Sequence, residues 1–288
     1  MAYTTIDDPE AYFQVVTYAG DGNTGRSVTL PGDTDMQPDM VWIKCRTNND
    51  AHADYDAVRG ANKRIGINEA DAEATQTEGL QSFTSDGFTH GTLNAGNASG
   101  RTYVAWCWKA GTTSGLSGGD TVPKVKIFKK RNSATTGDWA THHGSLASSS
   151  SMYLNSTNGQ DTSDLLGTDP TASVFTVDSD YANKSDDTYV AYLFGEVQGF
   201  SSFGKYTGNG NADGPFIYTG FRPAFVITKR YDAHGENWYM FDNKRGGSNP
   251  GNHYLYPNIA NAEVQTEQID ILSNGFKCRT TNAAVNLD

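Results

Sequence analysis

The chain has 288 residues, of which 36% are hydrophobic, and its formal net charge is −11. An acidic surface of this kind repels phosphate groups, so we expect no nucleic-acid partner. The sequence holds no apolar stretch long enough to span a bilayer, and the polar residues 1–10 do not resemble a signal peptide, which predicts synthesis in a cytosol. Its 31 Gly, 15 Tyr, 13 Phe and 5 Trp are typical of short aromatic strands joined by tight turns.

In chain order, the first set of predicted elements begins with a leader hairpin over residues 13–22. An apolar strand follows at residues 40–44 (MVWIK), and then come YDAVRG at 55–60 and KRIGIN at 63–68. A Gly-Phe hairpin at Gly87 and an alternating strand at 102–108 (TYVAWCW) close the set. The alternation of aromatic residues in the last segment is typical of a strand with a buried face.

The same series of landmarks recurs twice. The second copy has VKIFK at 125–129, WATHH at 139–143, MYLN at 152–155 and TYVAYLF at 188–194. The third has FVITK at 225–229, WYMFD at 238–242, YLYPN at 254–258 and LSNGFK at 272–277. Repeats of this kind indicate one supersecondary unit used several times.

The copies begin at Pro38, Pro123 and Pro223, and residues 203–223 repeat the leader of residues 13–38. We therefore divide the chain into residues 1–111 (leader hairpin plus repeat one), 112–199 (repeat two) and 200–288 (leader-like hairpin plus repeat three). The expected fold is all-β with very little helix, either a β-sandwich-like or a prism-like assembly of three pseudo-repeats. Repeat number alone does not decide between the two arrangements or give the strand order.

A basic run, KVKIFKKR at 124–131, alternates with apolar residues and is interpreted as an exposed strand. Cys45, Cys107 and Cys278 are odd in number and have no close pair, which predicts buried free thiols and no zinc knuckle. No motif for a cofactor is present, so none is expected.

Candidates for catalysis are few. His142 and His143 follow a strand in a serine-rich region, where a histidine pair is more often solvated than catalytic. No nucleophile, metal-ligand or general-base motif is found, and the scattered Asp and Glu residues select no pair for glycoside hydrolysis. The chain is therefore expected not to be an enzyme.

One loop has the residue types of a calcium site. Asn209, Asn211 and Asp213 place oxygen-bearing side chains at alternate positions before Gly214, like the first half of a calcium loop. The later bidentate Glu is missing, because position 220 is Gly. A turn in which Asn and Gly accept a positive φ is the competing interpretation.

Four segments carry a resemblance to a known family: residues 2–14, 37–44 (QPDMVWIK), 103–111 (YVAWCWKAG) and 214–223 (GPFIYTGFRP). Together they resemble virion-associated, tail-fibre-like proteins of marine tailed bacteriophages, over essentially the whole chain. The resemblance implies a structural component of a phage particle and brings no catalytic residues with it.

The resulting expectation is a non-enzymatic virion protein, made in the host cytoplasm, that acts as a tail-fibre or host-attachment component. Expected partners are other virion proteins, further copies in a homo-oligomer, and a host polysaccharide or outer-membrane protein bound through several weak contacts. Trp238 or Tyr153 could stack on sugar rings. The alternatives are a capsid decoration or head-fibre protein and, from another class, a polysaccharide depolymerase.

The third copy departs from the first at its end. The spacing from Gly87 to Tyr103 places the corresponding closing strand of copy three beyond Asp288. We therefore expect the hairpin that begins at residues 275–278 to lack a partner strand, and its edge to be completed by further residues or by a neighbouring chain.

Overall fold

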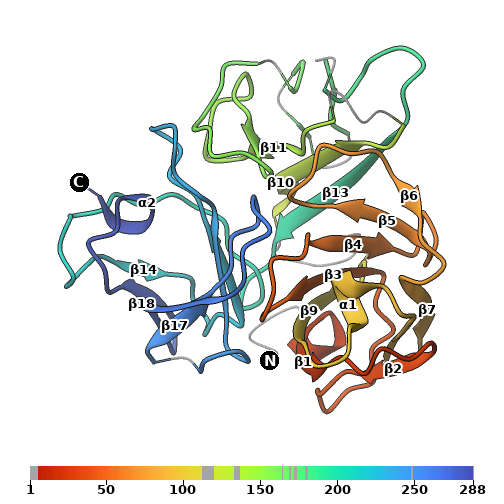
Figure 1. Cartoon of the computed structure of the whole chain (residues 1–288). Helices are drawn as coiled ribbons and strands as arrows, with labels where there is room; N and C mark the ends of the chain where they lie inside the picture. Colours follow the sequence, from red (N-terminus) through yellow and green to blue (C-terminus); the bar gives the residue numbers. More distant parts are fainter. Residues whose placement is uncertain are drawn as a thin grey trace.

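The computed structural model describes residues 6–111, 120–132, 137–163, 165–168, 170–171, 174–178, 181–247 and 249–287. With 38% strand and 4% helix, it confirms the all-β class. We name three parts: unit one (6–111), unit two (120–199) and unit three (200–287), which are the red-to-gold, green and blue regions of Figure 1. Residue 112, where the second part of the chain was expected to begin, and Asp288, where the third was expected to end, lie outside the described residues.

Unit one contains two sheets. A six-stranded sheet has the order β1-β9-β3-β4-β5-β6, and a three-stranded sheet has the order β2-β8-β7. The elements are η1 (Pro9–Ala11), β1 (Phe13–Ala19), β2 (Arg26–Thr29), β3 (Met40–Cys45), β4 (Ala53–Asp56), β5 (Lys63–Gly66), β6 (Ala74–Thr75), β7 (Leu80–Thr84), β8 (Gly87–His90), α1 (Asn94–Asn97) and β9 (Thr102–Trp108).

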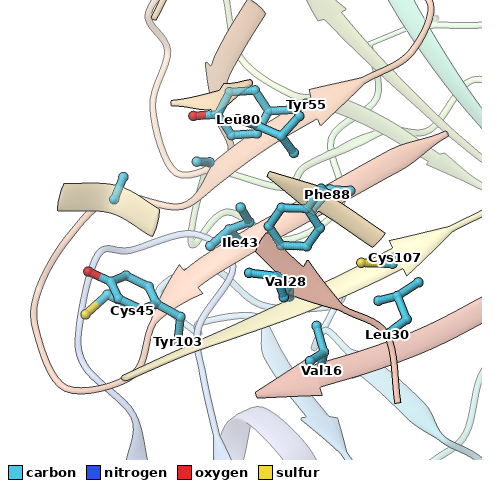
Figure 2. Close-up of a cluster of buried hydrophobic side chains, with 14 of the residues drawn as sticks. Val16, Val28, Leu30, Ile43, Cys45, Tyr55, Leu80, Phe88, Tyr103 and Cys107 are labelled. Atoms are coloured by element: carbon cyan, nitrogen blue, oxygen red, sulfur yellow. The ribbon is translucent and has the colours of Figure 1, made fainter. Parts of the chain in front are cut away.

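A buried cluster fills the space between these two sheets. Val28 of β2 and Phe88 of β8 lie against Ile43 of β3 and Cys107 of β9, as Figure 2 shows. Strand β9 is buried on both faces, since Tyr103, Ala105 and Cys107 join this cluster while Val104 and Trp106 join another. The alternation read from the sequence is therefore real, but neither face of this strand meets solvent.

Unit two has one four-stranded sheet with the order β12-β11-β10-β13. Its strands are β10 (Asp120–Lys130), β11 (Ala140–His143), β12 (Met152–Tyr153) and β13 (Tyr189–Glu196). The basic run does form a strand, but the expectation that it is exposed is wrong: Lys126, Lys129 and Lys130 are all buried. The ammonium of Lys126 donates to the Pro123 carbonyl at 2.6 Å, and that of Lys130 pairs with Asp187 at 2.7 Å.

Unit three repeats the two-sheet plan of unit one. A four-stranded sheet has the order β14-β19-β18-β17, and β15 pairs with β16 alone in the other sheet. The elements are β14 (Phe216–Tyr218), β15 (Phe225–Thr228), β16 (Tyr239–Asp242), β17 (Gly251–Tyr254), β18 (Val264–Leu272), β19 (Gly275–Cys278) and α2 (Ala283–Asn286).

The first hairpin of each unit has the same register. Trp42 faces Asp54 in unit one, Ile127 faces Thr141 in unit two, and Ile227 faces Met240 in unit three, all in antiparallel pairs. The closing strands match as well, since Trp42 is opposite Trp106 and Ile127 is opposite Tyr192. The three apolar runs recognised in the sequence therefore occupy equivalent strand positions.

A second buried cluster lies where the three units meet, and we call it the central core. It contains buried side chains from every unit: Val15, Trp42, Ile65, Ile67, Val104, Trp106, Trp139, Met152, Leu154, Trp238, Met240 and Leu255. Units one and three are thus small sandwiches around their own clusters. The six-stranded sheet of unit one, the sheet of unit two and the β15–β16 pair of unit three face the shared centre in a prism-like arrangement.

The hairpin at residues 275–278 does not lack a partner, contrary to the sequence-based expectation. Strand β19 pairs with β18 on one side and with β14 on the other. The incomplete edge lies on β15, which in the described part of the chain pairs only with β16. The equivalent strand β3 of unit one is held between β4 and β9.

The cysteine prediction is confirmed. Cys45, Cys107 and Cys278 are all buried and free.

Candidate functional site

The junction between the units brings together several buried polar groups, and it is closed by a ring of backbone hydrogen bonds. At each of its three seams an amide of one unit donates to a carbonyl of the next. The bonds run from Glu73 to Arg131 (2.9 Å), from Gln160 to Tyr231 (2.6 Å) and from Glu263 to Arg46 (2.8 Å). Because the third bond joins unit three back to unit one, the units form a closed pseudo-threefold ring.

A second ring of hydrogen bonds lies nearer the centre. The indole Nε1 of Trp139 donates to the Gly66 carbonyl at 2.8 Å, and that of Trp238 donates to the Tyr153 carbonyl at 3.0 Å. His52 takes the equivalent place in unit one, with Nε2 2.9 Å from the Tyr256 carbonyl. A ring N–H thus bonds a carbonyl of a neighbouring unit at each of the three seams, which indicates that Trp139, Trp238 and His52 hold the units together.

These hydrogen bonds also determine the tautomer and the charge of His52. Its Nδ1 accepts a hydrogen bond from the Trp42 indole at 2.8 Å, so Nε2 carries the proton that is donated to Tyr256. Burial, together with the nearby charge of Lys44, holds the pKa of His52 well below its usual value. The imidazole is therefore neutral and acts as a fixed hydrogen-bonding bridge.

Buried charges cluster at the seam between units one and two. Arg59 pairs with Asp54 at 2.8 Å and also with Asp56, and the Tyr192 hydroxyl of unit two lies 2.6 Å from each of these carboxylates. One hydroxyl has one proton, so the second contact needs a proton on a carboxyl group. Burial, opposed by Arg59, raises the pKa of Asp54 to about 6, which makes that protonation accessible.

The seam between units three and one repeats this cluster. Arg245 pairs with Asp242 at 2.6 Å and with Glu263 at 3.1 Å, while the Trp106 indole donates to Asp242 at 3.0 Å. Arg46 adds a second guanidinium to Glu263 at 2.9 Å, just as Arg131 binds Glu73. Both clusters join a carboxylate of one unit to an arginine of the next.

At the seam between units two and three the charged set is replaced as a whole. His143, Leu146, Gln160 and Tyr231 stand at the positions of Asp56, Arg59, Glu73 and Arg131. Exchange as a set has a physical reason, because removing one member of a buried ion pair leaves an uncompensated charge. The pattern indicates that these groups serve the junction.

Each unit also places one lysine at an equivalent position, at or just after the end of β3, β10 or β15, where Lys44 and Lys129 are buried and Lys229 is half-buried. The ammonium of Lys44 donates to the Cys45 and Asn48 carbonyls, and that of Lys229 donates to the Glu236 and Thr157 carbonyls. Lys129 donates to the carbonyls of Gly137 and Glu69. Burial lowers the pKa of all three lysines to about 8.

The sequence-predicted histidines and carboxylates lie within this framework. His142 and His143 are the last residues of β11, where His142 is buried and His143 is half-buried, so the expectation of a solvated pair is wrong. Asp54 and Asp56 form a close carboxylate pair that sequence reasoning did not select, and both are buried against Arg59. Asp56 also borders the large cleft described below, although it is only 4% exposed.

The aromatic residues proposed to stack on sugars are not at the surface. Trp238 is 6% exposed because it lies in the central core, and Tyr153 is 5% exposed because its ring packs in a separate buried cluster of unit two. A different aromatic pair is open to solvent: Phe216 and Tyr218 of β14, which are 45% and 70% exposed. Their register equivalents in β2 of unit one are Ser27 and Thr29.

The loop at Asn209, Asn211 and Asp213 forms a tight polar turn. Asn209 Oδ1 accepts from the Asn211 amide at 3.0 Å, and Asn211 Oδ1 accepts from the Asp213 amide at 2.9 Å. Asp213 pairs with Lys277 at 2.5 Å. A calcium ion here stays a prediction, and it would have to displace these contacts.

Two further searches bear on binding chemistry. In the ranges that the structure describes, no group of three or more His, Cys, Asp or Glu side chains is arranged to hold a metal ion. None of the helices in those ranges is long and apolar enough to cross a membrane.

The fold and its junction define an all-β protein assembled from internally repeated units. The chain belongs to the family described as a domain of unknown function (DUF7483), whose model matches it twice, over residues 8–121 and 112–288. No curated protein and no solved structure matches it.

Proposed function

We propose that this chain is a non-enzymatic structural protein of a tailed-phage virion, with a tail-fibre or host-attachment role. The support from sequence is the resemblance of residues 2–14, 37–44, 103–111 and 214–223 to tail-fibre-like virion proteins. The observation on which the attachment role rests is the exposed aromatic pair of Phe216 and Tyr218 on a rigid scaffold.

These two side chains suit a saccharide ligand. They alternate along β14, so both project from the same face of the strand, and β14 lies at the edge of its sheet. An exposed aromatic ring offers a flat apolar face to the C–H groups of a sugar. Unit one has hydroxyl side chains at the equivalent positions, so the scaffold does not require aromatic residues there.

In this proposal the virion carries several copies together with other virion proteins, and weak contacts to a host polysaccharide or outer-membrane protein add through effective concentration. Synthesis takes place in the host cytoplasm before assembly. The ring of seam contacts gives each copy a fixed shape, so binding faces of different copies can engage one cell surface together.

Two measurements test the proposal. Immunogold electron microscopy of phage particles that contain the chain should label the tail; label on the capsid surface or absence from the particle contradicts it. The double variant Phe216→Ser/Tyr218→Thr introduces the residues of unit one, and it should weaken binding of the purified chain to host cells roughly tenfold. Val58→Ser, at a residue 94% exposed in unit one, is the matched control and should bind normally. Equal binding by the double variant would contradict the attachment role.

A further inference from the structure

A large cleft lined by residues of all three units lies beside the free edge of β15. Its volume is about 1570 Å³, which exceeds the roughly 300–1,000 Å³ usual for small-molecule pockets. Its walls include Ile227 of β15, Tyr206, Val285 of α2, and Leu146 and Met152 of unit two. The cleft reaches the central core, because Leu154 and Trp238 line it as well.

Comparison with unit one shows what occupies this position there. Strand β9 runs between β1 and β3 and contributes Trp106 to the central core. In unit two the equivalent strand β13 pairs with β10 and contributes Tyr192 to the same core. Across the described residues of unit three, no third strand pairs with β15.

The free edge of β15 affects the exposure and the pairing of the residues beside it. Ile227 is 37% exposed, whereas its equivalent Trp42 is 4% exposed beneath β9. Residues 202–209, which correspond to part of β1, form no strand. Among the described residues, strand β15 and residues 202–209 thus lack the backbone partner that β3 and β1 have in β9.

The surroundings of the slot are nevertheless already formed as in unit one. Tyr206 donates to the Val285 carbonyl at 2.8 Å, just as Tyr18 donates to the Gly96 carbonyl at 2.8 Å. The Asn286 carbonyl accepts from the Gly210 amide at 2.9 Å, as Asn97 accepts from Gly22. The leader segment of unit three and α2 therefore already make the contacts that β1 and α1 make in unit one, although no described strand lies along the free edge of β15.

The backbone leaves both helices in the same direction. Ala98, after α1, has φ −68° and ψ 138°, and Leu287, after α2, has φ −86° and ψ 143°. In unit one this direction carries the chain into β9, which begins at Thr102. A segment that follows α2 at the same interval would enter the cleft along the free edge of β15.

We propose that the cleft is the acceptor site for an extended closing strand with the pattern Tyr-Val-Ala-aromatic-apolar-aromatic, which is the pattern that β9 and β13 share. It would run antiparallel to β15 and place its first aromatic residue after Ala in the central core. A strand of a second copy is a poorer occupant, since β9 is held on both sides and β13 is paired along β10.

The test appends a strand to the 288-residue chain. A copy of residues 100–109 placed directly after Asp288 keeps the interval of unit one, and a second variant carries a copy of residues 186–195. A control carries the first segment with Ser at the copies of Val104, Trp106 and Trp108, which face inward. We expect the appended strands, but not the control, to raise the melting temperature by about 5 °C or more and to reduce binding of the dye ANS.

The variant Ile227→Glu locates the effect. In the chain that carries an appended strand, it should remove most of the gain in melting temperature, while in the 288-residue chain it should change the melting temperature little. Failure of both appended segments to exceed the control would overturn the proposal. So would sedimentation showing that the 288-residue chain dimerises and that Ile227→Glu restores a monomer, because a second copy would then be the occupant.

Discussion

At the scale of single residues, the buried lysines are the least expected feature. Lys44 and Lys129 are fully buried, yet within the described residues neither forms an ion pair with a carboxylate; both ammonium groups donate to backbone carbonyls. An ammonium bound by neutral acceptors lacks a compensating charge, and burial therefore lowers its pKa to about 8. Lys129 and Lys229 each bind a carbonyl of the preceding unit, so they fix seams as well as loops.

These lysines predict an alkaline rise in stability. Between pH 8 and pH 9 the unfolded chain, with lysines of normal pKa, binds more protons than the folded chain, so the unfolding free energy rises with pH. The buried Lys44 and Lys129 each contribute at most about 1 kcal/mol over this interval, and the half-buried Lys229 contributes less because solvent screens it. The rise should weaken toward pH 9, because burial raises the pKa of Cys278 to about 11 while an unfolded cysteine titrates at about pH 8.5. This thiol therefore lowers the unfolding free energy as the pH rises through that range.

Urea unfolding at pH 7.5, 8, 8.5 and 9 measures this dependence. In the variant Lys44→Met the rise between pH 8 and pH 9 should shrink by the share of one lysine, whatever the absolute stability of the variant. Identical pH slopes for the variant and the parent chain would show that Lys44 has an ordinary pKa.

At the scale of elements, the contacts at the seams explain how three units built from short strands keep a fixed arrangement. Each seam combines at least one backbone hydrogen bond with one donor from an aromatic or imidazole side chain, and two seams add a buried charge cluster. The inner donors meet carbonyls in a buried environment, where an unpaired acceptor is costly.

Replacement of either indole should therefore have a similar cost. We expect Trp139→Phe and Trp238→Phe each to lower the unfolding free energy by about 1–3 kcal/mol beyond the loss of ring size, because each leaves a buried carbonyl without its donor. Trp108→Phe is the control, since that indole packs against Phe13 and Phe225. Chemical denaturation of the three variants gives the comparison, and equal losses at all three sites would argue against a special role of the inner ring.

At the scale of the whole molecule, the central core makes the units interdependent. Trp42, Val104 and Trp106 of unit one are buried only because units two and three cover them. A closed ring also differs from an open row of repeats, since every unit has a neighbour on both sides and none acts as a terminal cap.

The whole chain should accordingly unfold in one cooperative transition. Differential scanning calorimetry should give a calorimetric enthalpy equal to the van't Hoff enthalpy. A fragment of residues 6–111 should expose the face that carries Trp42 and Trp106, bind ANS and self-associate. Separate transitions for the units, or a monomeric fragment that binds no dye, would show that the central core couples them weakly.

The sequence by itself determined the fold class and the equivalence of the strands. Apolar runs such as those at 40–44, 125–129 and 225–229 repeat with the same flanking landmarks, and a side-chain period of two fixes which residues share a face. Asn209, Asn211 and Asp213 were readable as a turn for a similar reason, because Asn and Asp bind neighbouring amides locally.

Only the tertiary structure decided which polar residues are buried and which edge is open. The basic run at 124–131 has the pattern of an exposed strand. Its Lys129 nevertheless donates to the carbonyls of Glu69 and Gly137, and its Lys130 pairs with the carboxylate of Asp187. Trp238 is buried because a carbonyl of another unit accepts its N–H, while Tyr218 is exposed because nothing described covers β14. The free edge of β15 is likewise visible only in the strand pairing, where β15 pairs with β16 alone among the described residues. These outcomes depend on contacts between residues far apart in the chain, and local sequence patterns carry no record of them.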